Sequence, residues 1–303
     1  MNDLKNFWFS YSNILQNELI NKNYFSFLRK ILGVLYKYFV KFIRHKFSKK
    51  IKNLDKSDNK FLFNSGLDNL FLNFNCDKGT TCFFEGKKIL SHNYSIYYEK
   101  YLSKLKNEKL KILELGSHEG KGIASFFFYF PNSEIFGANI NPFQMKFVST
   151  RITELFVDVK SKKIIENLAE HLPNKLDIII DDASHNLRDI LITLPVLFKS
   201  IKSGGYYIIE DMDQFHVFKN LNPYKNELTP KEILLKIKNK EPFESIFLSE
   251  SEKEYLIKNI EEVRIEKGSM VIENKNISDI AFIKKKELFF LNYTENIFSE
   301  LKK

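Results

Sequence analysis

Apolar runs alternate with amphipathic segments between residues 110 and 211. The apolar runs predict strands at 110–117, 133–140, 153–159, 175–182 and 204–211. The intervening segments predict helices at 120–130, 161–172 and 186–202, and a further helix beginning at 141. Because the strands are apolar throughout and alternate with helices, they indicate a parallel sheet covered on both faces. The predicted fold class is α/β, with an open, doubly wound, mostly parallel sheet.

The pattern changes after residue 211. Thr229–Glu232 and Ser251–Glu254 both have the spacing of a capping box that opens a helix, so a helical insertion is expected at about 222–260. Residues 261–275 and 278–286 are strand-like and have no long helix between them. They predict an antiparallel C-terminal strand pair that closes one edge of the sheet.

The N-terminal region has a different periodicity. Residues 24–47 predict an amphipathic helix, whose apolar positions are Leu28, Leu32, Leu35, Phe39 and Phe42. A narrow polar stripe lies opposite them, at Ser26, Lys30, Gly33, Lys37, Lys41 and Arg44. The polar stretch 49–60 is typical of a linker. The expected organisation is a basic helical extension (1–58), a cap segment (59–105) and a main domain (106–303) that contains the insertion.

Charge is concentrated in the N-terminal extension. The 303-residue chain has a net charge of +9, and residues 21–54 hold ten Lys and Arg but no Asp or Glu. The remainder is therefore nearly neutral, which argues against a nucleic-acid-binding protein. The apolar face of the helix is too large to leave in water. We expect either burial against the body or a second subunit of a homo-oligomer, or contact of residues 24–47 with an anionic membrane surface.

Cysteine content and targeting features bear on location. Cys76 and Cys82 form neither a zinc pattern nor a disulfide framework, which is typical of a reducing compartment. The first residues lack the features of a signal peptide, and no segment reaches ~18 uninterrupted apolar residues. A cytoplasmic protein is expected, with the inner face of the membrane as an alternative. The abundance of Phe, Lys, Asn and Ile is typical of low-GC bacterial genomes.

The first strand–helix turn is a candidate ligand site. Glu114, Gly116 and Gly120 follow the spacing Glu-x-Gly-x-x-x-Gly, in which the glycines allow a ligand to approach the backbone and the helix N-terminus favours a negative group. The spacing differs from the dinucleotide pattern, and the acidic residue suits a cationic amino-acid ligand. The alternative is an ordinary tight turn with Glu114 in a salt bridge. Asn139 ends the second strand, where a ribose contact is expected, and Asp158 ends the third, as an adenine contact or a solvated turn residue.

Two pairs of acidic residues end the fourth and fifth strands. Asp181-Asp182 and Glu210-Asp211 should lie close together, because neighbouring strands are ~4.8 Å apart and ligands bind beyond their carboxyl ends. Bare carboxylates would repel, so the pattern predicts a divalent cation, Mg²⁺ first and Mn²⁺ or Fe²⁺ as substitutes. His185 follows in the next turn and could remove a proton from a hydroxyl near the metal. The alternative is a helix N-terminus capped by Asp182 or Ser184, with His185 at the surface.

Taken together, five motifs resemble one family. They are DKGT (77–80), HNYSIYY (92–98), ILELGSHEG (112–120), DDASH (181–185) and YYIIEDMD (206–213). The chain resembles class I S-adenosylmethionine methyltransferases with a Rossmann-like sheet, specifically the metal-dependent sugar O-methyltransferases of the macrocin and mycinamicin type, whose core is shared by relatives known as cephalosporin hydroxylases. The resemblance runs from about Asp77 to Asp211 and is weaker to about Lys284.

The resemblance implies a role for each matching residue. His185 is the proposed base, and the metal ligands are Asp182, Glu210 and Asp211. The cofactor contacts are Glu114, Gly116, Ser117, Gly120, Asn139, Asp158 and Asp181. The segment that closes over cofactor and substrate contributes Asp77, Lys78, His92 and Tyr94. Three features depart from the family pattern: Asn139 replaces Asp, Ala183 replaces Gly, and the third strand lacks the Gly-Asp-Gln-Ser-Asp sequence.

The function implied is methyl transfer from S-adenosyl-L-methionine to a sugar hydroxyl, with a divalent metal as cofactor. A nucleotide-sugar or a surface-polysaccharide precursor, of capsule or lipopolysaccharide, is the expected substrate class. One alternative is a catechol-type or other small-molecule metal-dependent O-methyltransferase. Another is a non-catalytic membrane- or nucleic-acid-binding protein that retains a decayed methyltransferase core.

Overall fold

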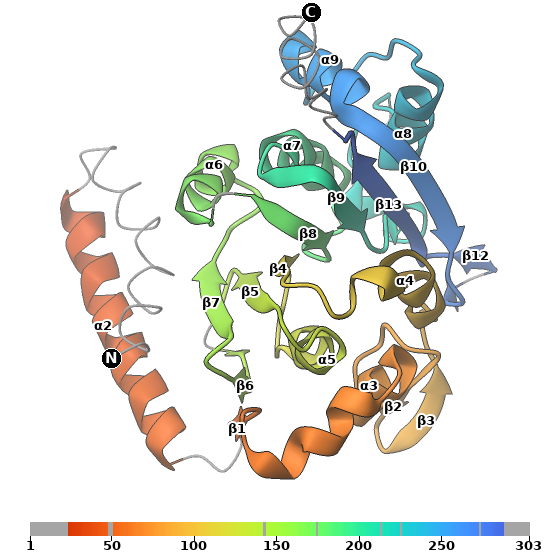
Figure 1. Ribbon diagram of the computed structural model, residues 1–303. Coiled ribbons are helices and arrows are strands. Elements are labelled where there is room, and N and C mark those ends of the chain that lie inside the picture. The colour runs from red at the N-terminus through yellow and green to blue at the C-terminus, as the bar shows by residue number, and fades with distance from the viewer. Residues whose placement is uncertain are drawn as a thin grey trace, which may run out of the picture.

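A computed structural model describes residues 24–47, 51–141, 144–173, 175–212, 214–224, 226–272 and 274–287. Its centre is a seven-stranded sheet in the order β10-β13-β9-β8-β4-β5-β7 (Figure 1). The parallel strands are β4 (Lys111–Leu115), β5 (Glu134–Asn139), β7 (Ile152–Phe156), β8 (Leu176–Asp181) and β9 (Ile201–Ile209). The antiparallel pair β13 (Asp279–Lys285) and β10 (Ile260–Lys267) extends the edge beyond β9. The predicted fold class and C-terminal strand pair are confirmed.

Helices cover both faces of the sheet (Figure 1). One face packs against α6 (Lys162–His171) and α7 (Leu187–Phe198), and the other against α3 (Leu67–Asn73), α4 (Ser95–Leu102) and α5 (Lys121–Tyr129). Successive residues of β8 enter opposite cores, since Ile179 packs with the α6–α7 side and Ile180 with the α5 side. Full burial of each such side chain contributes about 1.5–3 kcal/mol. The continuous Ile run of β8 is thus explained by burial on both faces.

Strand register brings the carboxyl ends of three central strands to one line. Leu115 of β4 lies beside Asp181 of β8, and Asp181 lies beside Ile209 of β9. The next residues in each chain segment, Gly116, Asp182 and Glu210, therefore share one edge of the sheet. The predicted adjacency of the two acidic strand ends is confirmed.

Residues 141–152 do not form the expected helix within the described part of the chain. The structure has instead a short strand, β6 (Phe147–Val148), which pairs in parallel with β1 (Lys52–Asn53). Phe147 is buried and its ring meets Phe74 edge-on at 5.3 Å, so tertiary packing overrides the helical periodicity. The prediction that 49–60 is a plain linker is wrong for 51–60, which contain β1 and the start of the 3-10 helix η1 (Ser57–Asn64).

The insertion after β9 contains α8 (Pro230–Asn239) and α9 (Glu250–Asn259), preceded by the 3-10 helices η4 (Gln214–His216) and η5 (Lys219–Leu221). Thr229 and Glu232 form the predicted capping box of α8. The box of α9 is formed by Ser249 and Glu252, two residues before the predicted pair. The Ser-x-x-Glu spacing occurs in both registers, and the observed one buries Glu252 against Lys162, at 2.6 Å.

The cap segment joins the main domain through the core. Its α3 and α4 pack with α5, and α4 is followed by the 3-10 helix η2 (Ser103–Leu105). Two hairpins extend from this side of the molecule, β2 (Thr81–Phe84) with β3 (Lys87–Leu90), and β11 (Val271–Ile272) with β12 (Lys275–Asn276). Cys76 and Cys82 are buried free thiols.

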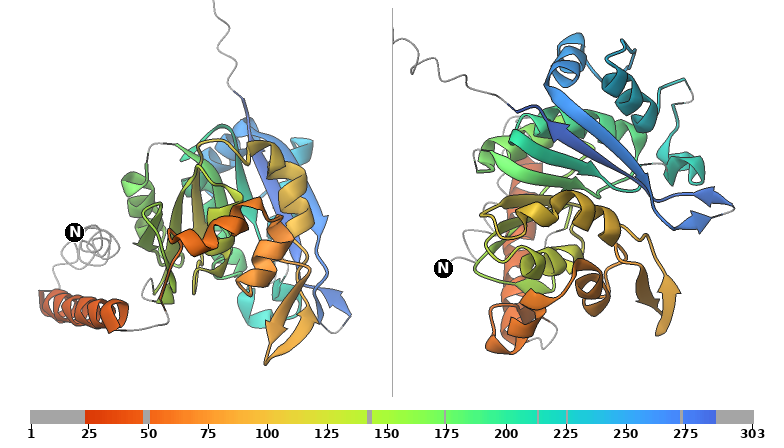
Figure 2. Two further views of the ribbon diagram at one scale, coloured as in Figure 1. Left: turned by 60° about the horizontal axis from the view of Figure 1, so that its bottom comes forward. Right: turned by 45° about the vertical axis from the view of Figure 1, so that its right-hand side comes forward.

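Helix α2 (Tyr24–Phe47) stands apart from this body, as the left view of Figure 2 shows. Several of its apolar side chains are exposed, among them Leu28, Leu35 and Phe39 at 56%, 51% and 59%. The structure thus lacks the expected burial of these three residues against the body. None of the described helices is long and apolar enough to cross a membrane.

Candidate functional site

The edge formed by β4, β8 and β9 opens into an acidic cavity of ≈ 370 Å³. It is lined by Asp77, Lys78, His92, Gly116, His118, Asn139, Asp182, Ala183, His185, Glu210, Asp211 and Gln214. Asp182, Glu210 and Asp211 come from the strand ends, whereas Asp77, Lys78 and His92 come from the cap segment. The structure therefore assembles one cavity from two regions of the chain that are more than 80 residues apart.

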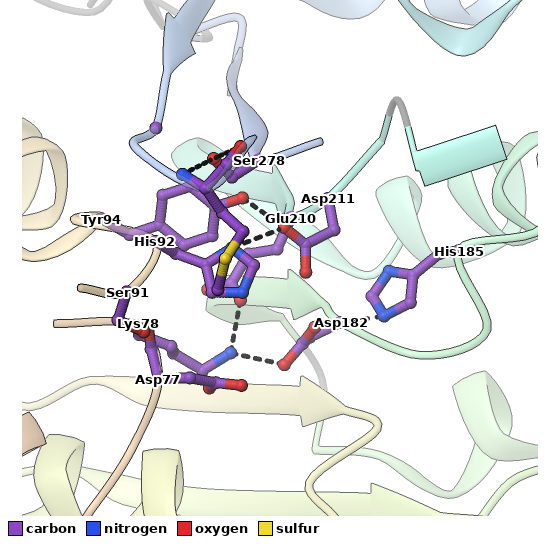
Figure 3. A network of polar contacts seen from close by, with 12 residues as sticks. Asp77, Lys78, Ser91, His92, Tyr94, Asp182, His185, Glu210, Asp211 and Ser278 are labelled. Atoms are coloured by element: carbon purple, nitrogen blue, oxygen red, sulfur yellow. Dashed lines mark hydrogen bonds and ion pairs between the residues drawn. The ribbon is translucent and has the colours of Figure 1, made fainter. Parts of the chain in front are cut away.

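Lys78 lies at the centre of the acidic residues. Its ammonium donates to Asp182 Oδ2 at 2.5 Å and to Glu210 Oε2, and it lies 3.5 Å from Glu114 Oε1. Burial lowers the pKa of Lys78, but the three carboxylates outweigh this effect and raise it well above its usual value. Lys78 is thus buried and positively charged, and Figure 3 shows it beside Asp182 and Glu210.

The cap segment also supplies donors to the last two carboxylates. Tyr94 donates its hydroxyl to Asp211 Oδ1 at 2.5 Å, and His92 Nδ1 lies 3.0 Å from the same oxygen. Tyr98 donates to Glu210 Oε1. Both carboxylate oxygens of Glu210 therefore accept hydrogen bonds from the protein, one from Lys78 and one from Tyr98. This leaves Glu210 less available as a metal ligand than the resemblance implies.

Four buried or half-buried carboxylates face only two cations. Burial lowers the pKa of His92, but hydrogen bonding and attraction to Asp211 raise it to about 9, so His92 is charged at neutral pH. Burial raises the pKa of Glu114 to about 7 and that of Glu210 to about 8. With all four acids ionised, Lys78 and His92 leave two negative charges unbalanced. A divalent cation would balance this charge.

Donor atoms for such a cation are grouped at one place. Asp182, His185 and Asp211 each offer one atom, and these atoms lie within 4.8 Å of one another. Asp182 Oδ1 and Asp211 Oδ2 accept no described hydrogen bond from protein, since Lys78, Tyr94 and His92 engage the other oxygens. Two free carboxylate oxygens suit a hard ion such as Mg²⁺, so the residues present fit the group.

His185 lies on the far side of Asp182 from Lys78 (Figure 3). Its Nε2 is 3.7 Å from Asp182 Oδ1, and its side chain is 21% exposed. His185 and Asp211 both have left-handed backbone, with φ of 52° and 53°, a conformation that costs a non-glycine residue energy and recurs at functional sites. Asn186 caps α7, accepting from the Arg188 amide at 3.1 Å, so the alternative in which Asp182 or Ser184 caps is wrong.

A second cavity, of ≈ 260 Å³, lies beside the glycine turn and shares Asp77, Lys78, Gly116, His118 and Asp182 with the acidic cavity. Glu114 Oε2 and Ser117 Oγ are buried there and make no hydrogen bond. Buried polar atoms without partners are costly, and an ammonium group would satisfy both. The turn therefore fits a cationic amino acid, and Glu114 also makes the ion pair of the alternative interpretation.

A third cavity, of ≈ 200 Å³, continues from the turn past the ends of β5 and β7. It is mostly apolar, with Ile140, Val157 and Val159 beside Asn139 and Asp158. Asn139 Oδ1 accepts from the Ile140 amide at 2.9 Å, and Asp158 Oδ1 accepts from the Lys160 amide at 3.0 Å. The Asn139 amide nitrogen also donates, to Asn141 O at 3.4 Å and Gln144 Oε1 at 3.3 Å. The apolar lining of this cavity suits a flat ring.

Two predicted cofactor residues lie away from these cavities. Asp181 is buried and accepts from the Tyr207 hydroxyl at 2.8 Å, and burial raises its pKa to about 6. Gly120 is the left-handed N-cap of α5, where a Cβ would overlap Met145 Sδ. Gly116 has a similar steric role beside its place in the cavities, since a Cβ there would overlap the backbone of Asp182.

Sequence reasoning missed three residues of the site. Tyr98 lies four positions after Tyr94 on the same helix face, and that spacing was the available signal. His118 lines the acidic cavity from the turn after β4, and Gln214 lines it from the start of η4. Neither has a local pattern that separates it from an ordinary surface residue.

No protein-family model matches the chain. A tetracenomycin rhamnosyl 3'-O-methyltransferase from Streptomyces olivaceus is 31% identical over 131 residues, which are 41% of this chain and 33% of that protein. The mycinamicin VI 2''-O-methyltransferase of Micromonospora griseorubida is 26% identical over 137 residues, 43% of this chain and 34% of that protein. The matches thus span about a third of the length of these curated relatives.

A solved structure supports the fold. MycE methyltransferase of the mycinamycin pathway, in complex with Mg, SAH and mycinamycin VI, superposes with a TM-score of 0.53 at 19% identity, covering 74% of this chain and 55% of that one. The sheet and the glycine turn define a protein with the class I S-adenosylmethionine methyltransferase fold. More narrowly, the chain is related to the sugar O-methyltransferases of the macrocin and mycinamicin type.

Proposed function

We propose that the protein transfers a methyl group from S-adenosylmethionine to a sugar hydroxyl, with a divalent metal as cofactor. The observation that carries the proposal is the junction of three cavities at one turn. Gly116 lines all three, so the apolar cavity, the turn with its unpartnered acceptors and the acidic cavity form one continuous site. The three cavities match the three groups that the cofactor's sulfonium joins: the nucleoside, the amino acid and the methyl group to be transferred.

Different residues of the chain would bind the cofactor, hold the metal and accept the proton. Glu114 and Ser117 would accept from the cofactor's amino group, and Asn139 and Asp158 would contact its nucleoside. Asp182 and Asp211 would hold the metal, which lowers the pKa of a nearby hydroxyl when bound. His185 would accept the hydroxyl proton on its ring nitrogen at the mouth of the cavity. Lys78 and Tyr98 hold Glu210 in place.

The lining of the acidic cavity favours a sugar over a flat aromatic diol. Asp77, His92, His118 and Gln214 add polar groups around the metal-binding residues. A sugar offers several hydroxyls to pair with them, whereas an aromatic ring would leave them desolvated and unpaired. One relative named above is by name a methyltransferase of a rhamnosyl tetracenomycin, and the other a methyltransferase of mycinamicin VI. We propose a nucleotide-sugar or a surface-polysaccharide precursor as the acceptor.

Two measurements test the proposal. Calorimetry with S-adenosylhomocysteine should give a heat of binding in wild type, and its absence would support the decayed core instead. Transfer of a labelled methyl group to a panel of nucleotide-sugars should then require Mg²⁺ and stop in excess chelator. A matched panel of catechols should remain unmethylated. Full activity in chelator, or methylation of catechols alone, would contradict the proposed chemistry.

A further inference from the structure

Helix α2 presents a continuous apolar surface that the other described residues leave uncovered. Seven of its apolar residues are more than half exposed: Tyr24, Phe25, Leu28, Leu32, Leu35, Tyr36 and Phe39. With 100° between successive residues, these seven positions fall within about one third of the helix circumference. A contiguous apolar surface of this size marks an interaction site.

The charge on α2 has one sign. The helix contains six Lys and Arg residues and no Asp or Glu, and Lys22, Lys49, Lys50 and Lys52 follow or precede it in the sequence. A surface that binds α2 must therefore offer apolar volume together with negative charge.

We propose that α2 docks the protein onto an anionic membrane surface. The helix is about 36 Å long at 1.5 Å per residue, and it can lie in the plane of the interface with Phe and Leu side chains among the acyl chains. Its basic residues then reach the anionic headgroups, which attract each Lys or Arg near the surface. This role differs from spanning a membrane, and it does not depend on the proposed methyl transfer.

A second copy of α2 fits the surface less well. Two such helices packed face to face would place six positive charges on each partner, with no acidic side chain on either helix to balance them. Because the polar stripe lies opposite the apolar face, the basic residues would remain on the outer sides of such a pair without compensating charge, whereas lipid phosphates supply that charge. The charge therefore favours a lipid surface as the occupant.

The test is flotation of the full-length protein with vesicles of phosphatidylcholine alone or with 30% phosphatidylglycerol (a probe composition of roughly cytoplasmic-leaflet charge). Wild type should float with the anionic vesicles, and binding should fall as salt rises. Leu32→Asp/Phe39→Asp should abolish flotation. Arg29→Gln/Lys37→Gln/Lys41→Gln should weaken it about a hundredfold, since each charge removed costs about fivefold. Ile246→Asp is the matched control, because Ile246 is 72% exposed, against 59% for both Leu32 and Phe39, but lies outside α2.

Light scattering and far-UV circular dichroism of the same variants complete the test. Folded variants that have lost flotation, with an unchanged mass, support the proposal. It is overturned if wild type does not float, if neutral vesicles bind equally well, or if Leu32→Asp/Phe39→Asp still floats. A halved mass of that variant without flotation of wild type would assign α2 to a second copy of the chain instead.

Discussion

The acidic cavity contains buried charges and helix α2 carries exposed apolar side chains, and among the described residues only the buried charges have partners. At the sheet edge, Glu114, Asp182, Glu210 and Asp211 each lie beside a cation or a hydroxyl of the cap segment. Along α2, by contrast, large apolar side chains face solvent. Each acid of the sheet edge thus has a partner in the cap segment, although two negative charges remain unbalanced, whereas these apolar side chains of α2 are left exposed. Substitutions in each region measure how much these side chains contribute to stability and turnover.

The largest expected effect is on stability, from Lys78→Met. Removing one partner of a buried ion-pair group leaves charge without compensation, so the free energy of unfolding at pH 7 should fall by about 3–5 kcal/mol. The loss should shrink at lower pH, where the carboxylates take up protons. Chemical denaturation measures both. Lys100→Met is the control, since Lys100 forms its ion pair with Glu266 at the surface and its removal should change little. Equal losses would mean that the cap segment does not neutralise the acids.

His185→Ala tests whether His185 acts in the reaction and not in stabilising the cavity. Turnover should fall by about 10²–10⁴, because general base catalysis typically contributes this factor. Affinity for S-adenosylhomocysteine and the unfolding midpoint should stay nearly unchanged. His171→Ala, on α6 outside the three cavities, should behave as wild type. A His185 variant with normal turnover would return this residue to a surface role.

The pair His92–Asp211 predicts a pH dependence of stability. The pKa of His92 is raised from 6.5 to about 9 in the folded state, so the folded protein binds this proton more tightly than the unfolded chain. Its contribution is fully present below pH 6.5 and is lost as pH rises through 9, a decrease of about 1–3 kcal/mol. Unfolding in chelator from pH 6 to 9.5 should show this decrease in wild type and a flatter profile in His92→Gln. Parallel profiles would contradict the ion pair.

The smallest effect should come from α2. Leu32 is 59% exposed, so Leu32→Ala should change the free energy of unfolding by less than about 0.5 kcal/mol. Leu70→Ala, a fully buried change of the same chemistry, should cost about 2–5 kcal/mol. A loss at Leu32 approaching that at Leu70 would show that α2 packs on the body, and the contrast between the two regions would disappear.

Local patterns were sufficient for most of the sheet. The apolar runs ending in Asp181 and Ile209 predicted β8 and β9, because burial on both faces requires uninterrupted apolar residues. Local patterns were insufficient where one stretch of sequence fits two local structures equally well. The Ser-x-x-Glu spacing fits both Ser249 and Ser251, and only the burial of Glu252 decides between them. The periodicity at 141–152 suited a helix, but Phe147 packs on Phe74 as part of a strand.

The site was predictable as a set of strand-end acids but not as a network of contacts. Parallel order alone brings Asp182 and Asp211 together, so their meeting followed from the sequence. The position of Lys78 between Asp182 and Glu210 did not, since it depends on how the cap segment crosses the sheet edge. The closure of Glu210 by Tyr98 has the same origin.

The wide separation of these contacts in the sequence has a consequence for protein synthesis. Lys78 precedes Glu210 by 132 residues, and Tyr94 precedes Asp211 by 117. At typical translation rates the cap segment therefore leaves the ribosome roughly 7–26 s before the last acidic strand end is made. Throughout that interval Lys78, Tyr94 and Tyr98 have none of the β9-end carboxylates to bind. The cavity is thus a late product of folding, and a nascent chain stalled before residue 210 should lack it altogether.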